Sequence, residues 1–199
     1  HIINPVYKEQ LYEFFRKEIE QIERLGGDLK DKEYLDFRRA LALVTLGGDE
    51  VKSNGEKFIA DFLFEHGIDF RYEKPWSWDR ANHLHGAPYP PDFSILTPDG
   101  RDLILEHWGT DIDDKTAEVP AWWSTNTDAY RNQIVDKRSY WLERNIPLIE
   151  THVGLMRSGR EAFEASLRET LESAGLTCVR RPEKELIERV MSSPNTISR

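Results

Sequence analysis

The sequence predicts a mixed α/β domain that follows an N-terminal helical extension. Apolar residues recur at helical spacing in the first 50 residues, and residues 53–152 then read as helix, three strands, helix and strand. The second of these helices stands between two strands, so it can cross back over the sheet. We therefore expect an α-β-β-β-α-β core, with a mixed central sheet flanked by helices, over residues 51–199, and the helical extension over residues 1–50.

The extension is expected to contain two helices. Asn4-Pro5 supplies a cap residue and a proline at the first helical position, and Gly26-Gly27 ends the apolar run. A second helix is expected over residues 32–46, ending at Gly47-Gly48. Neither helix carries a catalytic constellation, so both are interpreted as packing elements.

Caps and turns set the expected bounds of the later elements. A helix begins at Ser53 and ends near His66, with Gly67 as its C-terminal stop, and the turn residues 97–100 join two strands into a hairpin. The expected strands cover residues 68–73, 92–96, 102–108, 147–152 and 177–180. The other expected helices cover residues 127–143, 161–173 and 182–191.

Composition places the chain among folded globular proteins, with 39% hydrophobic and 32% charged residues. No apolar run approaches the ~20 residues that cross a bilayer, so no membrane partner is expected. The single Cys178 cannot form an internal disulfide and no signal peptide is visible, which together predict a cytoplasmic location. Because the chain begins with His1, we expect either a piece of a longer protein or a processed terminus.

The net charge of −9 argues against a dedicated DNA-binding module, because such modules carry a basic surface for phosphate contacts. It is compatible with a catalytic site that concentrates carboxylates for a metal, if another domain holds the nucleic acid.

Two carboxylates fall where a metal site can form. Asp92 begins a strand, and Glu106 lies near the end of the paired strand, 14 residues later. In a twisted hairpin such positions converge on one side of the sheet. With a backbone carbonyl and waters, two carboxylates supply the all-oxygen shell that Mg²⁺ requires.

A third carboxylate, Glu56, lies on the preceding helix, on the stripe of Ile59, Ala60 and Leu63 that is expected to face the sheet. The alternative is that Glu56 only completes an S-x-x-E capping box with Ser53. Asp92 also has an alternative, as a turn residue after two prolines. Glu106 follows residues that a strand should bury, and a buried carboxylate needs a partner or a metal.

These residues carry a family resemblance. Glu56 on the first helix, Pro91-Asp92 at the second strand and Glu106 near the end of the third resemble the PD-(D/E)xK, restriction-endonuclease-like nucleases over residues 51–152. The segments 51–63, 72–73, 91–93 and 106–109 look like the nuclease-type domains of bacterial superfamily 1 helicases of the helicase IV sort. The resemblance implies Mg²⁺ or Mn²⁺ held by Asp92, Glu106, Glu56 and the His107 backbone carbonyl. It also implies DNA as substrate and a helicase or other domain of the same polypeptide as partner.

One position departs from this family. Its usual lysine, two residues after the third-strand acid, falls on Trp108. Tyr130, Gln133 and Lys137 share one face of the helix over residues 127–143, so we expect Lys137 to replace that lysine, with Gln133 and Tyr130 assisting at the phosphate. The alternative is that Lys137 is a solvated surface residue.

Other features have competing interpretations. His83, His85 and His107 invite a zinc site, but the lack of cysteine ligands and the abundance of carboxylates disfavour it. His152 could border the site, although a capping or core role is favoured. Long-loop aromatics could stack on bases or complete the core, and the core is favoured for most of them: Trp76, Trp78, Tyr89, Trp122 and Trp123. Four arginines could border a DNA path or be ordinary surface: Arg157, Arg160, Arg180 and Arg181.

The sequence therefore predicts a Mg²⁺-dependent deoxyribonuclease. A second hypothesis is an inactive nuclease-fold domain that binds nucleic acid or docks a protein after losing its lysine. A mismatch-type or RNA-directed endonuclease on the same fold is a third.

Overall fold

The computed structural model describes residues 43–73, 90–121 and 123–192. The chain divides into two compact units, residues 1–42 and 43–199, and the described residues all belong to the second. The helix expected to follow Asn4-Pro5 and most of the one expected over residues 32–46 lie outside the described residues.

The second unit is a mixed α/β fold. Two short strands, β1 (Leu43–Val44) and β2 (Glu50–Val51), form an antiparallel pair. The main sheet has the order β3 (Phe70–Tyr72), β4 (Phe93–Leu96), β5 (Asp102–Trp108) and β6 (Leu148–His152). The first three of these strands run antiparallel, and β6 joins β5 in parallel, so the sheet is mixed as expected.

Five helices accompany the strands in the described residues: α3 (Asn54–Glu65), α4 (Thr127–Glu143), α5 (Val153–Met156), α6 (Arg160–Ser173) and α7 (Glu183–Ser192). None of these helices is both long enough and apolar enough to cross a membrane. Because α4 lies between β5 and β6 in the chain, it makes the crossover that two parallel strands require.

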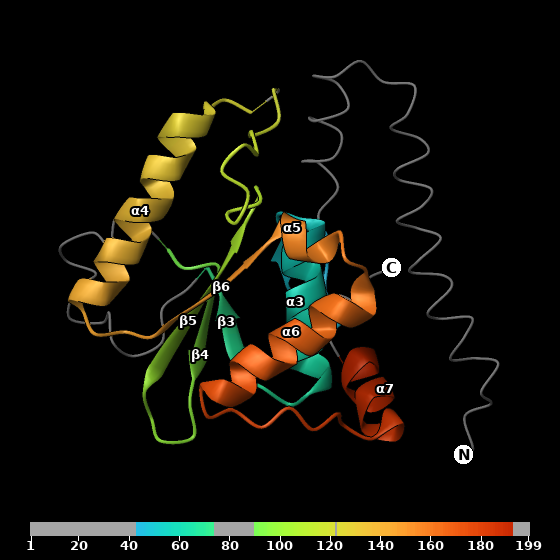
Figure 1. The fold of residues 1–199 in the computed structure, drawn as a ribbon. Coiled ribbons are helices and arrows are strands. Elements are labelled where there is room, and N and C mark those ends of the chain that lie inside the picture. The colour runs from blue at the N-terminus through green and yellow to red at the C-terminus, as the bar shows by residue number, and fades with distance from the viewer. Residues whose placement is uncertain (1–42, 74–89, 122, 193–199) are drawn as a thin grey trace, which may run out of the picture. The chain divides into compact units, whose positions relative to one another are not determined.

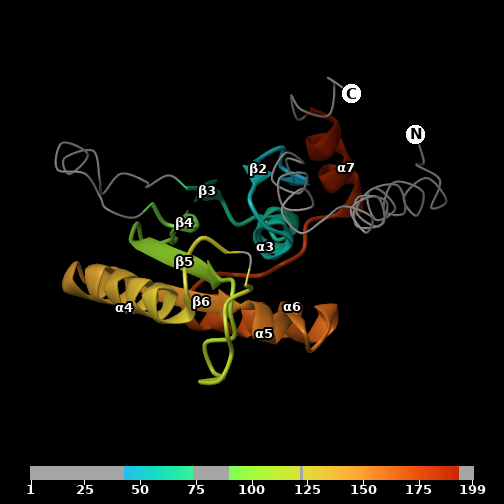
Figure 2. The same ribbon diagram turned by 90° about the horizontal axis from the view of Figure 1, so that it is seen from above.

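Helices cover both faces of the main sheet (Figures 1 and 2). Alternate residues of β4 and β5, such as Phe93 and Leu105, join a core with α3 and α6. The opposite face of β5 carries Glu106 and is covered by α4, whose Trp141 is fully buried. Each fully buried Leu, Ile or Phe side chain contributes about 1.5–3 kcal/mol, so the α3–sheet–α6 core is the main stabilising layer.

The helix and hairpin signals are confirmed. Ser53 Oγ accepts the Glu56 N–H at 3.1 Å at the start of α3, and Gly67 follows the helix with φ of 70°. Gly100 has φ of 80° in the turn between β4 and β5, where a side chain would be strained. The bounds of α4 and β5 agree with the predicted ranges 127–143 and 102–108.

Two predicted elements are wrong. Residues 43–44 form β1 instead of ending a helix, because Gly47-Gly48 makes a hairpin turn in which Thr45 accepts the Gly48 N–H at 3.0 Å. Residues 177–180 form no strand. The backbone of this segment bonds to a helix and not to the sheet, since the Arg181 N–H donates to the Glu65 carbonyl of α3 at 2.8 Å. The short helix α5 was not predicted, and Cys178 is buried in the core.

The start of α3 approaches β5 closely at Gly55. A Cβ added there would lie 2.0 Å from His107 Nε2, so only glycine allows this contact. The His107 ring is fixed from its other side, where Nδ1 lies 2.9 Å from Thr151 Oγ1. The contact holds Glu56, the next residue, near the end of β5.

We expect Gly55→Ala to lower the free energy of unfolding by about 1–3 kcal/mol, because the new methyl group overpacks against a fixed imidazole. Urea unfolding measures this loss. Gly47→Ala is the matched control, since its Cβ would meet its nearest atom, on Phe64, at 3.4 Å and its φ is not positive. Equal stability of Gly55→Ala and the wild type would contradict this close contact.

Candidate active site

Asp92 and Glu106 meet on the α4 face of the sheet. The register that pairs Phe93 with Leu105 puts Asp92, just before β4, opposite Glu106 on β5. Asp92 Oδ2 accepts the His107 N–H at 2.7 Å, which fixes its carboxylate beside β5. The hairpin thus brings together the two carboxylates as the sequence predicts.

Glu106 is fully buried and is held by two donors from α4. Lys137 Nζ lies 2.8 Å from Glu106 Oε2, and Trp141 Nε1 donates to Oε1 at 3.3 Å. Only 14% of the Lys137 side chain is exposed, and its ammonium lies 5.5 Å from the centre of the Trp108 ring. Lys137 is therefore at the carboxylates and not a solvated surface residue.

The Asp92 and Glu106 carboxylates each disfavour ionisation of the other. Burial, followed by electrostatic repulsion from Glu106, raises the pKa of Asp92 to about 8 against the lowering effects of Lys137 and the His107 N–H. Burial also raises the pKa of Glu106, although Lys137 opposes this. One ammonium therefore does not neutralise both carboxylates, and the pair retains a proton near neutral pH unless another cation is present.

Glu56 serves the start of its helix. Its Oε2 accepts the Lys52 backbone N–H at 2.9 Å and the Tyr72 hydroxyl at 2.6 Å, while Ser53 caps the same helix end. The Glu56 charge still contributes to raising the pKa of Asp92, so it is electrostatically part of the site. Glu56, Asp92 and Glu106 do not, however, bring ligand atoms within 4.8 Å of one another.

The two other predicted α4 residues differ in placement. The Tyr130 hydroxyl accepts the Gly109 N–H at 2.9 Å, just past the end of β5. Burial raises the pKa of Tyr130 to about 12, and the charges of Asp92 and Glu106 add to the rise. Gln133 is exposed and makes no hydrogen bond to the part of the chain that the structure describes.

A second acid, which is half-buried, adjoins the site and was missed from the sequence. Glu150 on β6 is the direct cross-strand partner of Glu106. Its Oε1 accepts Trp108 Nε1 and Arg138 Nε, each at 2.7 Å. Trp108, which occupies the position of the family's lysine, is therefore a buried hydrogen-bond donor. The signal available in the sequence was an acid inside the apolar strand over residues 147–152.

A different group can hold a metal ion. Asp111, Asp113 and His152 each offer a ligand atom within 4.8 Å of the other two, and they are the group of described residues that meets this criterion. His152 was expected to border the site or to serve as a cap or core residue, while the two aspartates were not predicted as candidates. The available signal was D-x-D after one strand and a histidine ending its parallel neighbour.

Most of the other predicted residues that the structure describes make contacts within the protein. Trp123 packs on Tyr130, with ring centroids 5.1 Å apart, and His107 is buried with the pKa of its ring lowered to about 4 by burial. Trp76, Trp78, Tyr89, Trp122, His83 and His85 lie outside the described residues. Three of the four arginines form ion pairs within the protein: Arg160, Arg180 and Arg181 pair with Glu164, Glu65 and Glu185.

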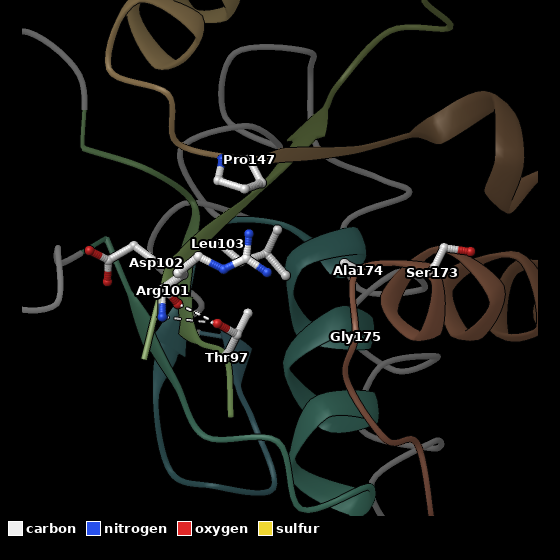
Figure 3. A pocket seen from close by; sticks show the side chains of 8 residues that line it. All are labelled: Thr97, Arg101, Asp102, Leu103, Pro147, Ser173, Ala174 and Gly175. Atoms are coloured by element: carbon white, nitrogen blue, oxygen red, sulfur yellow. Dashed lines mark hydrogen bonds between the residues drawn. The ribbon is translucent and has the colours of Figure 1, made fainter. Parts of the chain in front are cut away.

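A pocket of about 330 Å³ lies at the other end of β5 (Figure 3). Its lining residues come from the β4–β5 turn, the starts of β5 and β6, and the end of α6: Thr97, Arg101, Asp102, Leu103, Pro147, Ser173, Ala174 and Gly175. Glu106 lies four residues beyond Asp102 along the extended strand, so this pocket is separate from the carboxylates.

The chain matches no protein-family model, no curated protein and no solved structure.

The raised pKa of Asp92 makes stability depend on pH. The carboxyl has a pKa of 3.8 when unperturbed and about 8 in the folded protein, so the folded state binds the proton more tightly. Its stabilising contribution is complete below the unperturbed pKa and is lost as pH rises through about 8. In the presence of a chelator, we expect the free energy of unfolding to fall between pH 6 and pH 9.

Urea unfolding at both pH values measures this fall. Asp92→Asn should reduce it, because asparagine carries no proton to lose, whereas the exposed Asp69→Asn should leave it unchanged. An identical pH dependence in all three proteins would exclude the carboxylate coupling.

Proposed function

We propose that this chain is a Mg²⁺-dependent deoxyribonuclease that hydrolyses phosphodiester bonds. The observation that carries the proposal is the position of Lys137, 2.8 Å from the buried Glu106 and on the face where Asp92 lies. A paired Asp and Glu with a neighbouring lysine, all partly or fully shielded from water, is the set of groups that the PD-(D/E)xK chemistry requires.

The order of elements supports the same proposal. The sequence of α3, β3, β4, β5, α4 and β6 is the α-β-β-β-α-β order of a restriction-endonuclease-like core. In this order, Asp92 precedes the second strand, Glu106 lies on the third and Lys137 lies on the crossover helix. Movement of the lysine from the strand to this helix resembles a known variation of that superfamily.

The carboxylate pair suits a hard divalent cation. Asp92 and Glu106 offer only oxygen ligands. Burial, followed by repulsion from Glu106, raises the pKa of Asp92 although Lys137 lies nearby. The His107 N–H points to Asp92, and in an extended strand the carbonyl of the same residue points the same way, so this carbonyl would serve as a third ligand. A bound Mg²⁺ would polarise the scissile phosphate and lower the pKa of a water.

The chain's own groups would perform the remaining tasks. Lys137 would orient the attacking water and offset the charge that develops on the phosphate. Glu56 would act through water, because its carboxylate is already bonded to Lys52 and Tyr72. Gln133 is exposed and can reach a phosphate from α4, while Tyr130 fixes the strand end through Gly109.

An inactive nuclease-fold domain is the second candidate. The observation that favours it is the buried Trp108, which replaces the usual lysine and is bonded to Glu150. In that case the Lys137–Glu106 pair would be a structural ion pair, and the domain would bind nucleic acid or dock a protein. The partner domain, a helicase or other DNA-processing motor of the same polypeptide, is proposed for either case.

A nuclease assay on single- and double-stranded DNA, with Mg²⁺, Mn²⁺ or a chelator, tests the proposal. We expect metal-dependent cleavage that Lys137→Ala reduces by about 100- to 1,000-fold, because one preorganised charge at the reacting phosphate is removed. Lys184→Ala is the control, since Lys184 is an exposed lysine on α7 that pairs only loosely with Glu188, at 3.8 Å.

Calorimetry with Mg²⁺ accompanies this assay, so that loss of the lysine and loss of the metal can be told apart. Lys137→Gln, which keeps a hydrogen-bond donor beside Glu106, guards against a folding defect. Asp92→Asn should weaken Mg²⁺ binding, whereas folded Lys137→Gln should keep it and lose cleavage. Full activity in both lysine variants would favour another cation, and inactivity of the wild type with metal bound would favour the docking domain.

The acidic surface predicts how the domain meets DNA. With a net charge of −9, we expect the isolated chain to bind DNA weakly and with a shallow salt dependence, because few phosphates are neutralised. Fluorescence anisotropy at several salt concentrations measures the slope. Tight binding that falls steeply with salt would show that this chain grips the substrate by itself.

A further inference from the structure

The ends of β5 and β6 carry a cluster that the proposed nuclease site does not use. Asp111 and Asp113 follow β5 in the loop before α4, and His152 is the last residue of β6. The later part of this loop is held by Arg131 of α4, which donates to the carbonyls of Lys115 and Ala117 at 2.6 and 2.9 Å. The segment that directly follows the two aspartates is therefore anchored to α4.

His152 presents a buried nitrogen that has no hydrogen-bond partner. The side chain is 5% exposed, and its Nε2 lies 3.1 Å from Asp113 Oδ2, in hydrogen-bonding geometry. Its Nδ1 lies 3.2 Å from Asp111 Oδ1, yet this contact is out of line for a hydrogen bond, and Nδ1 is unsatisfied. A buried polar atom without a partner is costly, so it needs a ligand.

The arrangement suits a metal better than a proton on Nδ1. A doubly protonated ring would leave the Nδ1–H without an acceptor in line. A ring protonated at Nε2 instead donates to Asp113 and aims the Nδ1 lone pair beside a carboxylate oxygen, a repulsive arrangement unless a cation lies between them. Two ligands that are each about 2.1 Å from one ion lie ~3.0 Å apart at a right angle and ~3.4 Å apart at the tetrahedral angle of Zn²⁺ sites. The 3.2 Å between Nδ1 and Asp111 Oδ1 fits that spacing.

We propose that Asp111, Asp113 and His152 form a site for a divalent transition metal, of which Zn²⁺ is the test ion. His152 Nδ1 and the Asp111 carboxylate bind the ion directly. Asp113 accepts the Nε2–H and so fixes the ring and its tautomer, as carboxylates commonly do behind histidine ligands. Waters complete the shell.

The ligand type separates this site from the carboxylate pair. Imidazole nitrogen favours zinc and its neighbours in the transition series, whereas Mg²⁺ prefers oxygen. The Asp111 side chain is held in place, because its Oδ1 accepts the Asp113 N–H at 3.1 Å and its Oδ2 lies close against Gly154. The bound ion would join the loop after β5 to the end of β6, so its role is to fasten these two strand ends together.

The test uses the full chain with Asp92→Asn and Glu106→Gln, which removes the proposed Mg²⁺ site from the measurement. We expect Zn²⁺ to raise the melting temperature and to shift the ¹⁵N resonance of His152 Nδ1. Addition of Asp111→Asn should remove the binding of one Zn²⁺ per chain. Addition of Asp113→Asn should lower the affinity for that Zn²⁺ by about 10- to 100-fold. Asp114→Asn, the same charge change next to the cluster, should leave Zn²⁺ binding unchanged.

The ¹⁵N measurement is repeated on the wild-type chain with excess Mg²⁺, which guards against a folding defect in the variants. Zn²⁺ binding that is unaltered by Asp111→Asn, or a His152 Nδ1 resonance that does not move with Zn²⁺, overturns the proposal. Either result is independent of nuclease activity, since the readouts are stoichiometry and a ring resonance. Failure of the nuclease proposal would equally leave this test intact.

Discussion

The arrangement of the sheet and α4 depends on the buried carboxylate of Glu106. A charge placed in the interior of a protein loses hydration, and that loss is large unless a counter-charge and hydrogen bonds replace the water. Lys137 and Trp141 supply both from one helix, one turn apart. Because the acid is on β5 and its partners are on α4, the need to compensate one carboxylate fixes where the crossover helix lies on the sheet.

Lys137 compensates Glu106 but leaves the site with more carboxylates than cations. Asp92 faces Glu106 with a raised pKa, and Glu56 adds further negative potential while it ties down the start of α3. A site built for stability alone would pair each acid with its own base. The excess of carboxylates over cations at this face, within a protein of net charge −9, supports the proposed metal-assisted reaction.

Local patterns predicted the parts of this protein that depend on neighbours in sequence. Caps and turn residues located α3, α4 and the β4–β5 hairpin, and the hairpin placed Asp92 beside Glu106. Contacts between distant segments were not predictable in this way. The partnership of Glu150 with Trp108 spans 42 residues, and the Asp111–His152 contact joins a loop to a strand that follows a whole helix. The helix expected through residue 46 failed for the related reason that glycines can end a helix or turn a hairpin.

The pairing of Glu106 with Glu150 across the parallel strands has a consequence for how the chain finds its alignment. Two acids side by side repel each other, and here each is paired with one of two consecutive residues of the crossover helix, Lys137 and Arg138. If β6 slipped by one position, Glu150 would turn to the opposite face, into the apolar layer, and Arg138 would lose its partner. The two ion pairs therefore favour the native strand alignment over a shift by one residue, which an apolar sheet would disfavour less.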